Sequence, residues 1–458
     1  MSLCGASMSL FIRDRLATLV HGIRFDGLPP AVVHQVKRIV LDTLACAYGA
    51  IHSEPARMTR EIARALGGTP ECALIGATEK TSCTLATLVN GTLMRYLDGN
   101  DYYFGRDSAH PSGNLAPALA VAQHARRNGR DLIEAMVIAY EIQLRLCDLT
   151  GVSGRGWHPG THVQFASATL AARLLADDVK VTANAIAIAA SHNNTLAQSQ
   201  RGNIPMMKAT AEAMISKGGV EAALLAFKGL TGPEEVFEGD AGWSKVVAGE
   251  LDSGALTAPC EDRYRVMDAC FKPYAAVAGA MAPIQAAIDL ATQNVIHADS
   301  IEQITIKLPA SAAKKASGDP KKLVPRDKET ADHSFHYCVA VALLDKACGE
   351  AQFSEARLNS PQMRELIART RIESDDALTA LYPGSSGGGV TVKLRGGETF
   401  EKQYPYPPGH PRNAGSDADI ERRFFELSEE VLARPAAQAV IDAVWRLDTL
   451  EDLARFPA

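Results

Sequence analysis

Residues 96–114, "YLDGNDYYFGRDSAHPSGN", bring two carboxylates and an imidazole close together in the chain. Asp98 and Asp101 are three residues apart, and His110 follows in a His-Pro-Ser turn before an apolar segment. A carboxylate can hold a histidine in one tautomer, and a histidine transfers protons near neutral pH. The stretch therefore indicates acid–base chemistry; the alternative for Asp101 is the role of a helix cap.

Three more basic side chains lie in turns beside apolar segments. His158 belongs to "GRGWHPGTH", Lys208 opens the alanine-rich segment after "GNIPMM", and Lys272 belongs to "CFKPY". Such placements favour shifted pKa values, because an apolar neighbour partly desolvates the charged group. These residues are candidates for a site shared with His110. The alternative for His158 is a loop histidine whose ring is fully hydrogen-bonded.

Several familiar motifs do not fit. "GSSGGG", residues 384–389, lacks the Lys-Ser/Thr ending of a phosphate-binding loop and precedes a strand, so we interpret it as a flexible turn. No cysteine cluster could hold an iron–sulfur centre. His333 and His336 are three residues apart in a helical pattern, and we interpret both as packing residues. The sequence therefore predicts no metal site.

The first part of the chain, to about residue 265, is predicted to be mostly helical. Residues 31–50 and 129–147 place apolar side chains at helical spacing, with Asp131 as the expected N-cap of the second helix. Residues 209–230 are rich in alanine and apolar nearly all round, which is typical of a buried helix.

The pattern changes near residue 270. Alternating apolar residues predict a strand at 301–308, and a similar pattern at 389–404 predicts a hairpin that turns at Gly396-Gly397. The tail from about residue 415 is helical again. We therefore expect an α+β fold, with a small α/β unit between two helical parts of the chain.

Composition and charge restrict the function. The 458 residues carry a net charge of −6, which argues against a nucleic-acid partner. Nine cysteines are scattered without a C-x-x-C pair, as expected for reduced thiols in a cytoplasmic protein. No apolar run reaches the roughly 18 residues of a membrane helix, and the start of the chain lacks a secretory signal, so no membrane partner is expected.

Five motifs in order resemble signatures of the MmgE/PrpD family, which includes 2-methylcitrate dehydratase, cis-aconitate decarboxylase and iminodisuccinate epimerase. They are "RYLDGNDYY…HPSGN", "MMKATAEAMISKGGVEAALLAFKGLTGP", "FKPY", "RDKETADHSFHYCVAVALLD" and "YPPGHPRN". The resemblance implies a large all-α helical domain from both chain ends, a smaller α/β lid domain, a homodimer and no cofactor. We expect the domains at residues 1–268, 269–406 and 407–458, with the active site in the cleft between them.

The resemblance also implies site residues. The catalytic candidates are Asp98, His110, His158, Lys208 and Lys272. The candidates for substrate binding are Asp101, Tyr102, Arg201 and Tyr274. Tyr102 stands where the family often has threonine, and Val277 lies where cis-aconitate decarboxylases carry a histidine. This disfavours decarboxylation and makes Tyr274 a candidate proton donor.

The shared substrates of the family are di- and tricarboxylates, and the shared step removes a proton from the carbon next to a carboxylate. Lysines would bind the carboxylates and histidines would move the proton. We expect a cofactor-free lyase similar to 2-methylcitrate dehydratase. The alternatives are an epimerase of a dicarboxylate such as iminodisuccinate, a cis-aconitate-type decarboxylase, and an inactive homologue that only binds.

Overall fold

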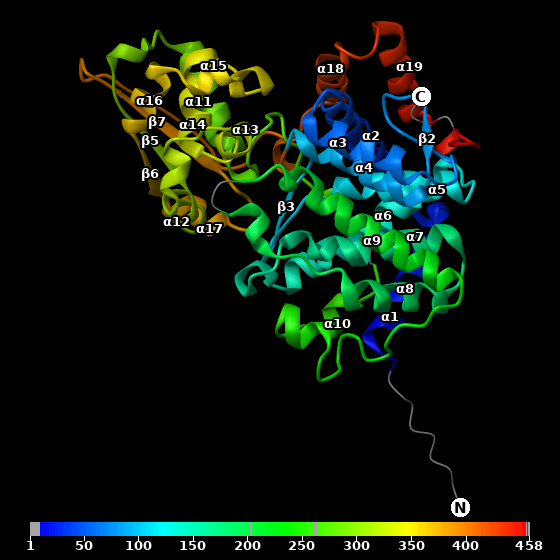
Figure 1. Ribbon diagram of the computed structural model, residues 1–458. Coiled ribbons are helices and arrows are strands. Elements are labelled where there is room, and N and C mark those ends of the chain that lie inside the picture. Colours follow the sequence, from blue (N-terminus) through cyan, green and yellow to red (C-terminus); the bar gives the residue numbers. More distant parts are fainter. Residues whose placement is uncertain (1–9, 202–203, 261–262, 455, 457–458) are drawn as a thin grey trace, which may run out of the picture.

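The computed structural model describes residues 10–201, 204–260, 263–454 and 456, which form two hydrophobic cores. The larger core uses side chains from residues 12–269 and again from 420–456. The smaller core uses Tyr102 and residues 270–394. We call the structures around them the helical unit and the α/β unit; they lie side by side in Figure 1.

The helical unit contains most of the helices. Their bounds are α1 Ile12–Gly22, α2 Pro30–Gly49, α3 Glu54–Leu66, α4 Cys83–Tyr96, α5 Leu115–His124, α6 Gly129–Leu149, α7 Val163–Leu175, α8 Val179–His192, α9 Met207–Phe227, α10 Ser253–Leu256, α18 Asp417–Ser428 and α19 Arg434–Trp445. The helices predicted at 31–50, 129–147 and 209–230 are confirmed as α2, α6 and α9. The predicted N-cap of α6 is wrong: Asn128 is the cap, and Asp131 completes its capping box.

Helix α9 lies in the middle of the helical unit and packs against α4, α7 and α8 (Figure 1). Small residues permit this packing: a Cβ atom on Gly91 of α4 would lie only 2.8 Å from Cβ of Ala213. Because α9 begins at Met207, Lys208 lies in its first turn.

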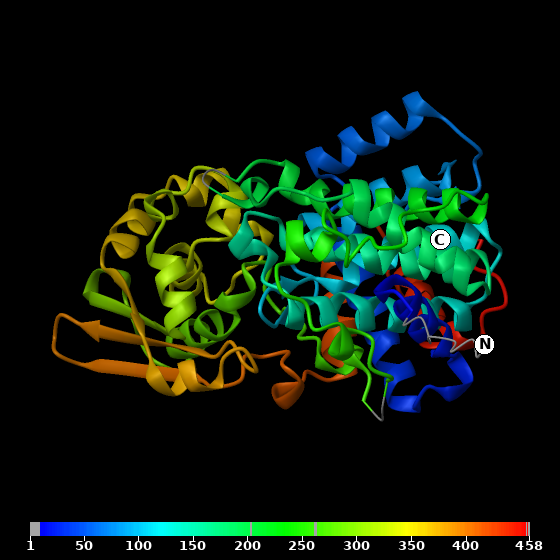
Figure 2. The same cartoon turned by 90° about the horizontal axis from the view of Figure 1, so that it is seen from below.

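The α/β unit holds a mixed sheet in the order β6-β5-β7-β8. Its strands are β5 Ile301–Leu308, β6 Thr370–Ser374, β7 Gly388–Leu394 and β8 Thr399–Tyr404, and its helices are α11 Met281–Gln293, α12 Ala310–Ser317, α13 Lys328–Ala331, α14 Phe335–Asp345, α15 Glu355–Leu358, α16 Pro361–Ala368 and α17 Asp376–Leu381. The predicted strand and hairpin are confirmed as β5 and β7–β8. Figure 2 shows the hairpin along one side of the unit, where α11 packs on it.

Two features connect the units. The tail returns to the helical unit, where α18 and α19 pack on α2 (Figure 1). Tyr102 and Cys270 exchange two backbone hydrogen bonds of 2.8 Å, which join the loop after α4 to the start of the α/β unit. Short strand pairs, β1 Cys72–Ala73 with β2 Lys80–Thr81 and β3 Tyr103–Phe104 with β4 Ser108–Ala109, complete the fold.

The described residues contain no helix that could cross a membrane. Eight of the nine cysteines lie in the described part of the chain and form no disulfide there, whereas Cys4 lies outside it.

Candidate active site

A small cavity of about 40 Å³ lies where the helical unit meets the α/β unit. Its wall is almost entirely polar and comes from both units. The lining residues are Arg95, Asp98, Ser108, His110, His158, Pro159, Gln200, Lys208, Glu212 and His333. Four predicted residues from three stretches of the sequence, Asp98, His110, His158 and Lys208, therefore meet in space.

Asp98 is the centre of the charge network. Helix α4 ends at Tyr96, and Asp98 turns the chain with a φ of 51°, a left-handed conformation that aspartate tolerates better than most residues. Its Oδ2 lies 3.2 Å from Lys272 Nζ and 3.6 Å from Lys208 Nζ. Burial alone would raise the pKa of Asp98, but the two ammonium groups outweigh burial and hold this pKa well below its usual range.

Lys272 lies behind Asp98, outside the cavity wall. Its Nζ donates to the backbone carbonyls of Asp98 at 2.8 Å and Ala276 at 3.0 Å, and it contacts the Asp98 carboxylate. All three ammonium hydrogens thus have acceptors in the protein. Burial lowers the pKa of Lys272 to about 8, and the Asp98 charge opposes this shift. Lys272 therefore acts on the site through Asp98.

Asp101 also stands behind the wall and holds the histidine loop. Its Oδ1 accepts from Ser112 N at 3.0 Å, and its Oδ2 accepts from the Tyr140 hydroxyl at 2.5 Å. Its backbone carbonyl accepts from His110 Nδ1 at 2.8 Å. This bond places the proton of neutral His110 on Nδ1 and leaves Nε2 as an acceptor.

The two predicted histidines are neutral for the same main reason. Burial, together with the Arg95 charge, lowers the pKa of His110 far below its usual value and that of His158 to about 3. His158 Nδ1 accepts from Gly160 N at 2.8 Å, while its Nε2 lies against the Gln200 amide. His158 thus has both ring nitrogens engaged, whereas no residue in the described part of the chain bonds to Nε2 of His110, which is therefore the better proton acceptor.

Lys208 faces the α/β unit across the cavity. Its Nζ lies 3.4 Å from His333 Nδ1 and 3.8 Å from Asp332 Oδ1. His333 lies in the turn between α13 and α14, and the interpretation of His333 as a helical packing residue is therefore wrong. It lies on the cavity wall, with Nε2 3.8 Å from Asp98 Oδ2.

Three predicted substrate contacts lie elsewhere. The Tyr274 hydroxyl donates to Gln285 at 2.6 Å, away from the cavity wall. Arg201 is exposed and donates to the carbonyl of Ser153 at 3.3 Å. Tyr102 lines a different cavity.

Arg95 and Glu212 were missed in the sequence. Arg95 Nε lies 2.7 Å from Glu212 Oε2, and both side chains reach the cavity from α4 and α9. The signal was present: Glu212 follows Lys208 at helical i,i+4 spacing, so both lie on one face of α9.

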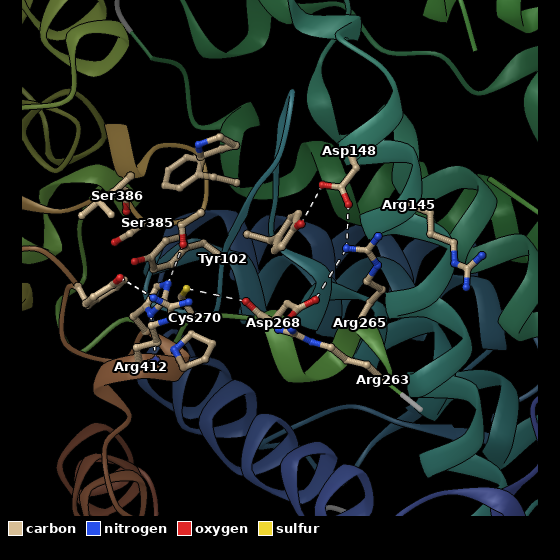
Figure 3. A pocket seen from close by; sticks show the side chains of 18 of the residues that line it. Tyr102, Arg145, Asp148, Arg263, Arg265, Asp268, Cys270, Ser385, Ser386 and Arg412 are labelled. Atoms are coloured by element: carbon tan, nitrogen blue, oxygen red, sulfur yellow. Dashed lines mark hydrogen bonds and ion pairs between the residues drawn. The ribbon is translucent and has the colours of Figure 1, made fainter. Parts of the chain in front are cut away.

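The cavity that Tyr102 lines is much larger, about 900 Å³, and is shown in Figure 3. Most of its charged groups pair with one another: Arg265 lies 2.9 Å from Asp148, Arg263 pairs with Asp268, and Arg145 pairs with Glu141 at 2.9 Å. Arg412 instead donates to the Tyr406 hydroxyl at 2.6 Å. The ring nitrogens of His410 both form hydrogen bonds. This cavity therefore offers less for acid–base chemistry than the small one.

The small cavity combines cations for an anionic substrate with an imidazole that can accept a proton. No group of three or more His, Cys, Asp or Glu side chains within the described ranges has an arrangement that could hold a metal ion. The arrangement suits proton transfer on a small, negatively charged molecule.

Two family models match the chain: the MmgE/PrpD N-terminal domain over residues 14–254 and the MmgE/PrpD C-terminal domain over residues 274–449. Cis-aconitate decarboxylase from Homo sapiens is 26% identical, with 96% of this chain and 92% of that protein covered. 2-Methylcitrate dehydratase from Cupriavidus necator is 25% identical (89% and 90% covered), and that from Salmonella typhi is 24% identical (88% and 87% covered).

Proposed function

The chain belongs to the MmgE/PrpD family, and from this premise we propose that it is a lyase acting on a tricarboxylate, by dehydration of a 2-methylcitrate-like hydroxy acid. One observation carries the proposal: His110 lines a cavity that also holds the ammonium group of Lys208, and its Nε2 has no hydrogen-bond partner among the described residues. A base beside a fixed positive charge is what removal of a proton next to a carboxylate requires.

In the proposed reaction, His110 Nε2 takes the proton from the carbon next to a substrate carboxylate. The C–H electron pair forms the carbon–carbon double bond, the C–O bond breaks, and the hydroxide leaves as water after it takes up a proton. Lys208 stabilises the carboxylate on which negative charge grows, because a cation that is already in position stabilises this charge as it develops. Asp98 fixes the position of Lys208.

His158 and Arg95 complete this proposal. His158 stays neutral and fixed by Gly160 N, so it shapes the cavity beside the substrate without changing charge. Arg95 pairs with Glu212 at 2.7 Å, whereas the carboxylates nearest to Lys208 Nζ are 3.6 Å (Asp98) and 3.8 Å (Asp332) away. Lys208 is therefore the less tightly paired cation and the one that would bind a substrate carboxylate.

A second candidate is decarboxylation of a cis-aconitate-like acid. The observation that favours it is the human cis-aconitate decarboxylase, which resembles this chain over 96% of its length. In that reaction a C–C bond breaks, CO₂ leaves, and the remaining electron pair takes up a proton on carbon. Decarboxylation needs an acid that protonates this carbon, whereas dehydration needs a base as well as an acid.

Proton NMR in D₂O distinguishes these reactions. The purified protein is incubated with 2-methylcitrate, citrate, cis-aconitate, tartrate or iminodisuccinate. Loss of the methine signal of 2-methylcitrate, with its methyl doublet replaced by the singlet of a methyl group on a double bond, supports dehydration. New C–H signals from cis-aconitate in a product that has lost one carboxylate as CO₂ support the second candidate. Deuterium exchange with a change only in stereoisomer ratio indicates an epimerase. No change in any substrate, while a known dehydratase reacts in parallel, contradicts the proposal.

A further inference from the structure

The cavity wall contains a further histidine, His333, that has no role in the proposed function. His333 stands across from the helical unit, at the end of the short α13 helix. The position is fixed by the neighbouring backbone: the carbonyl of Asp332 accepts from Val277 N at 2.8 Å, and Ser334 caps α14 by accepting from Tyr337 N at 3.1 Å. The imidazole is therefore held between two anchored residues.

Asp332 is placed to orient this imidazole. Its Oδ1 is hydrogen-bonded to His333 Nδ1, and its Oδ2 accepts from Lys328 Nζ at 3.1 Å. Lys328 is fixed in turn over the ring of Tyr96, 5.0 Å from its centre. Asp332 is fully buried, so its carboxylate cannot turn to solvent instead. The Nδ1–H of His333 thus points to Asp332, and Nε2 is left to face Asp98 and the cavity.

We propose that His333 is a catalytic acid of this site and that Asp332 is its positioning residue. This inference rests on the proposed function. In dehydration, protonated His333 gives its Nε2 proton to the oxygen of the breaking C–O bond, so that hydroxide leaves as water, while His110 takes the proton from carbon. One proton is gained by His110 and one is lost by His333, and exchange with solvent restores both after product leaves.

The charges around the two histidines divide these roles. Burial lowers the pKa of His110 most, the cations Arg95 and Lys272 lower it further, and the Asp98 carboxylate opposes them. His333 faces two carboxylates, Asp332 on its own turn and Asp98 after α4, and one cation, Lys208 on α9. Burial and Lys208 lower the pKa of His333, and the two carboxylates oppose this. The pKa of His333 is lowered overall in the free protein, and a bound polyanion raises it by adding negative charge beside the ring.

The first test is the pH dependence of turnover in His333→Gln and Asp332→Asn. We expect His333→Gln to lower kcat by on the order of 10²–10⁴-fold and to remove the alkaline limb of the kcat profile, because that limb reports loss of the acid's proton. Asp332→Asn should keep the limb but move it to lower pH, since the imidazolium loses its carboxylate. His336→Gln, a buried histidine outside the cavity wall, is the matched control and should keep both limbs.

Two outcomes overturn the inference while the proposed function stands. In the first, the wild type turns over substrate and His333→Gln has the same kcat. In the second, the alkaline limb of both variants is the same as that of the wild type. A second measurement does not need turnover. The His333 ring signal, assigned by its loss in His333→Gln, is titrated by NMR with and without tricarballylate. The titration midpoint should rise with tricarballylate and fall in Asp332→Asn; a midpoint that responds to neither change overturns the inference.

Discussion

The carboxylate of Asp98 and the ammonium group of Lys272 form a fully buried ion pair, with 3.2 Å between Oδ2 and Nζ. Asp98 comes from the end of α4, and Lys272 comes from the segment that leads into the α/β unit. Because Lys272 also donates to the Asp98 carbonyl, the pair fixes both the backbone and the side chain of the residue on which Lys208 depends.

Replacement of Lys272 by methionine should destabilise the protein by about 3 kcal/mol, because loss of one partner leaves a buried carboxylate less well compensated. Urea unfolding measures this change. The matched control is Lys217→Met on α9, where a partly exposed i,i+4 pair with Glu221 should contribute only about 0.5 kcal/mol. Equal stabilities of the two variants would contradict this account of the pair.

Replacement of His110 by glutamine should lower kcat by on the order of 10²–10⁴-fold, because it removes the proton acceptor. Glutamine can still donate to the Asp101 carbonyl, so the free energy of unfolding should change little. His124→Gln at the end of α5 serves as the control and should keep normal turnover. A near-normal kcat in His110→Gln would remove His110 from the mechanism.

Replacement of Gly160 by alanine should lower turnover by displacing His158. A Cβ atom there would lie 2.6 Å from His158 Nδ1 and 3.0 Å from Glu212 Cγ, so one of these side chains must move. Gly154→Ala in the preceding turn is the control, because nothing lies within 4 Å of its Cβ position. Steady-state kinetics of both variants, with thermal unfolding alongside, give the comparison; equal kcat values would mean that His158 tolerates displacement.

Asp101 should make stability depend on pH. Burial raises its pKa to about 6 in the folded state, above the value near 4 of an unfolded chain, so the folded protein binds the extra proton. This contribution to stability is complete below about pH 4 and is lost as pH rises through 6, a change of about 3 kcal/mol. In Asp101→Asn the loss is absent. The difference in unfolding free energy between variant and wild type should therefore rise across this range, and a constant difference would contradict the assignment.

Replacement of Tyr274 by phenylalanine should leave kcat within about twofold, because the hydroxyl bonds to Gln285 rather than to the cavity. Kinetics of this variant separate the two candidate donors: Tyr274, which was proposed from the sequence, and His333, which lies on the cavity wall. A large loss of kcat, with stability unchanged, would restore Tyr274 as a donor.

The convergence of Asp98, His110, His158 and Lys208 could be predicted because each lies in a turn next to an apolar helix, a local pattern that sequence carries. The sequence could not predict whether a side chain lies in the cavity wall or behind it, because this depends on packing between distant elements. Lys272 and Asp101 were predicted to touch substrate, yet the carbonyl of Ala276 and the hydroxyl of Tyr140 engage them behind the wall.

His333 and β6 were missed for physical reasons. His333 precedes a strongly apolar helix and is three residues from His336, which is a helical spacing. Because of this spacing, His333 was assigned to the helix rather than to the turn that ends at Ser334. Strand β6 is short and mostly polar, and its pairing with β5 is parallel and distant in sequence, which leaves no local hairpin signal. The positions of His333 and β6 both depend on contacts that form only when the α/β unit folds.

A chamber of about 40 Å³ has room for only a few water molecules, which is less than a tricarboxylate needs with the walls in place. His333 lies on one side of the chamber and Lys208 on the other, so admission of a substrate requires the two units to separate there. Each catalytic cycle then includes an opening and closing of the two units, which must move through solvent. Turnover limited by that motion would slow in proportion to added viscogen, however fast the proton transfers are.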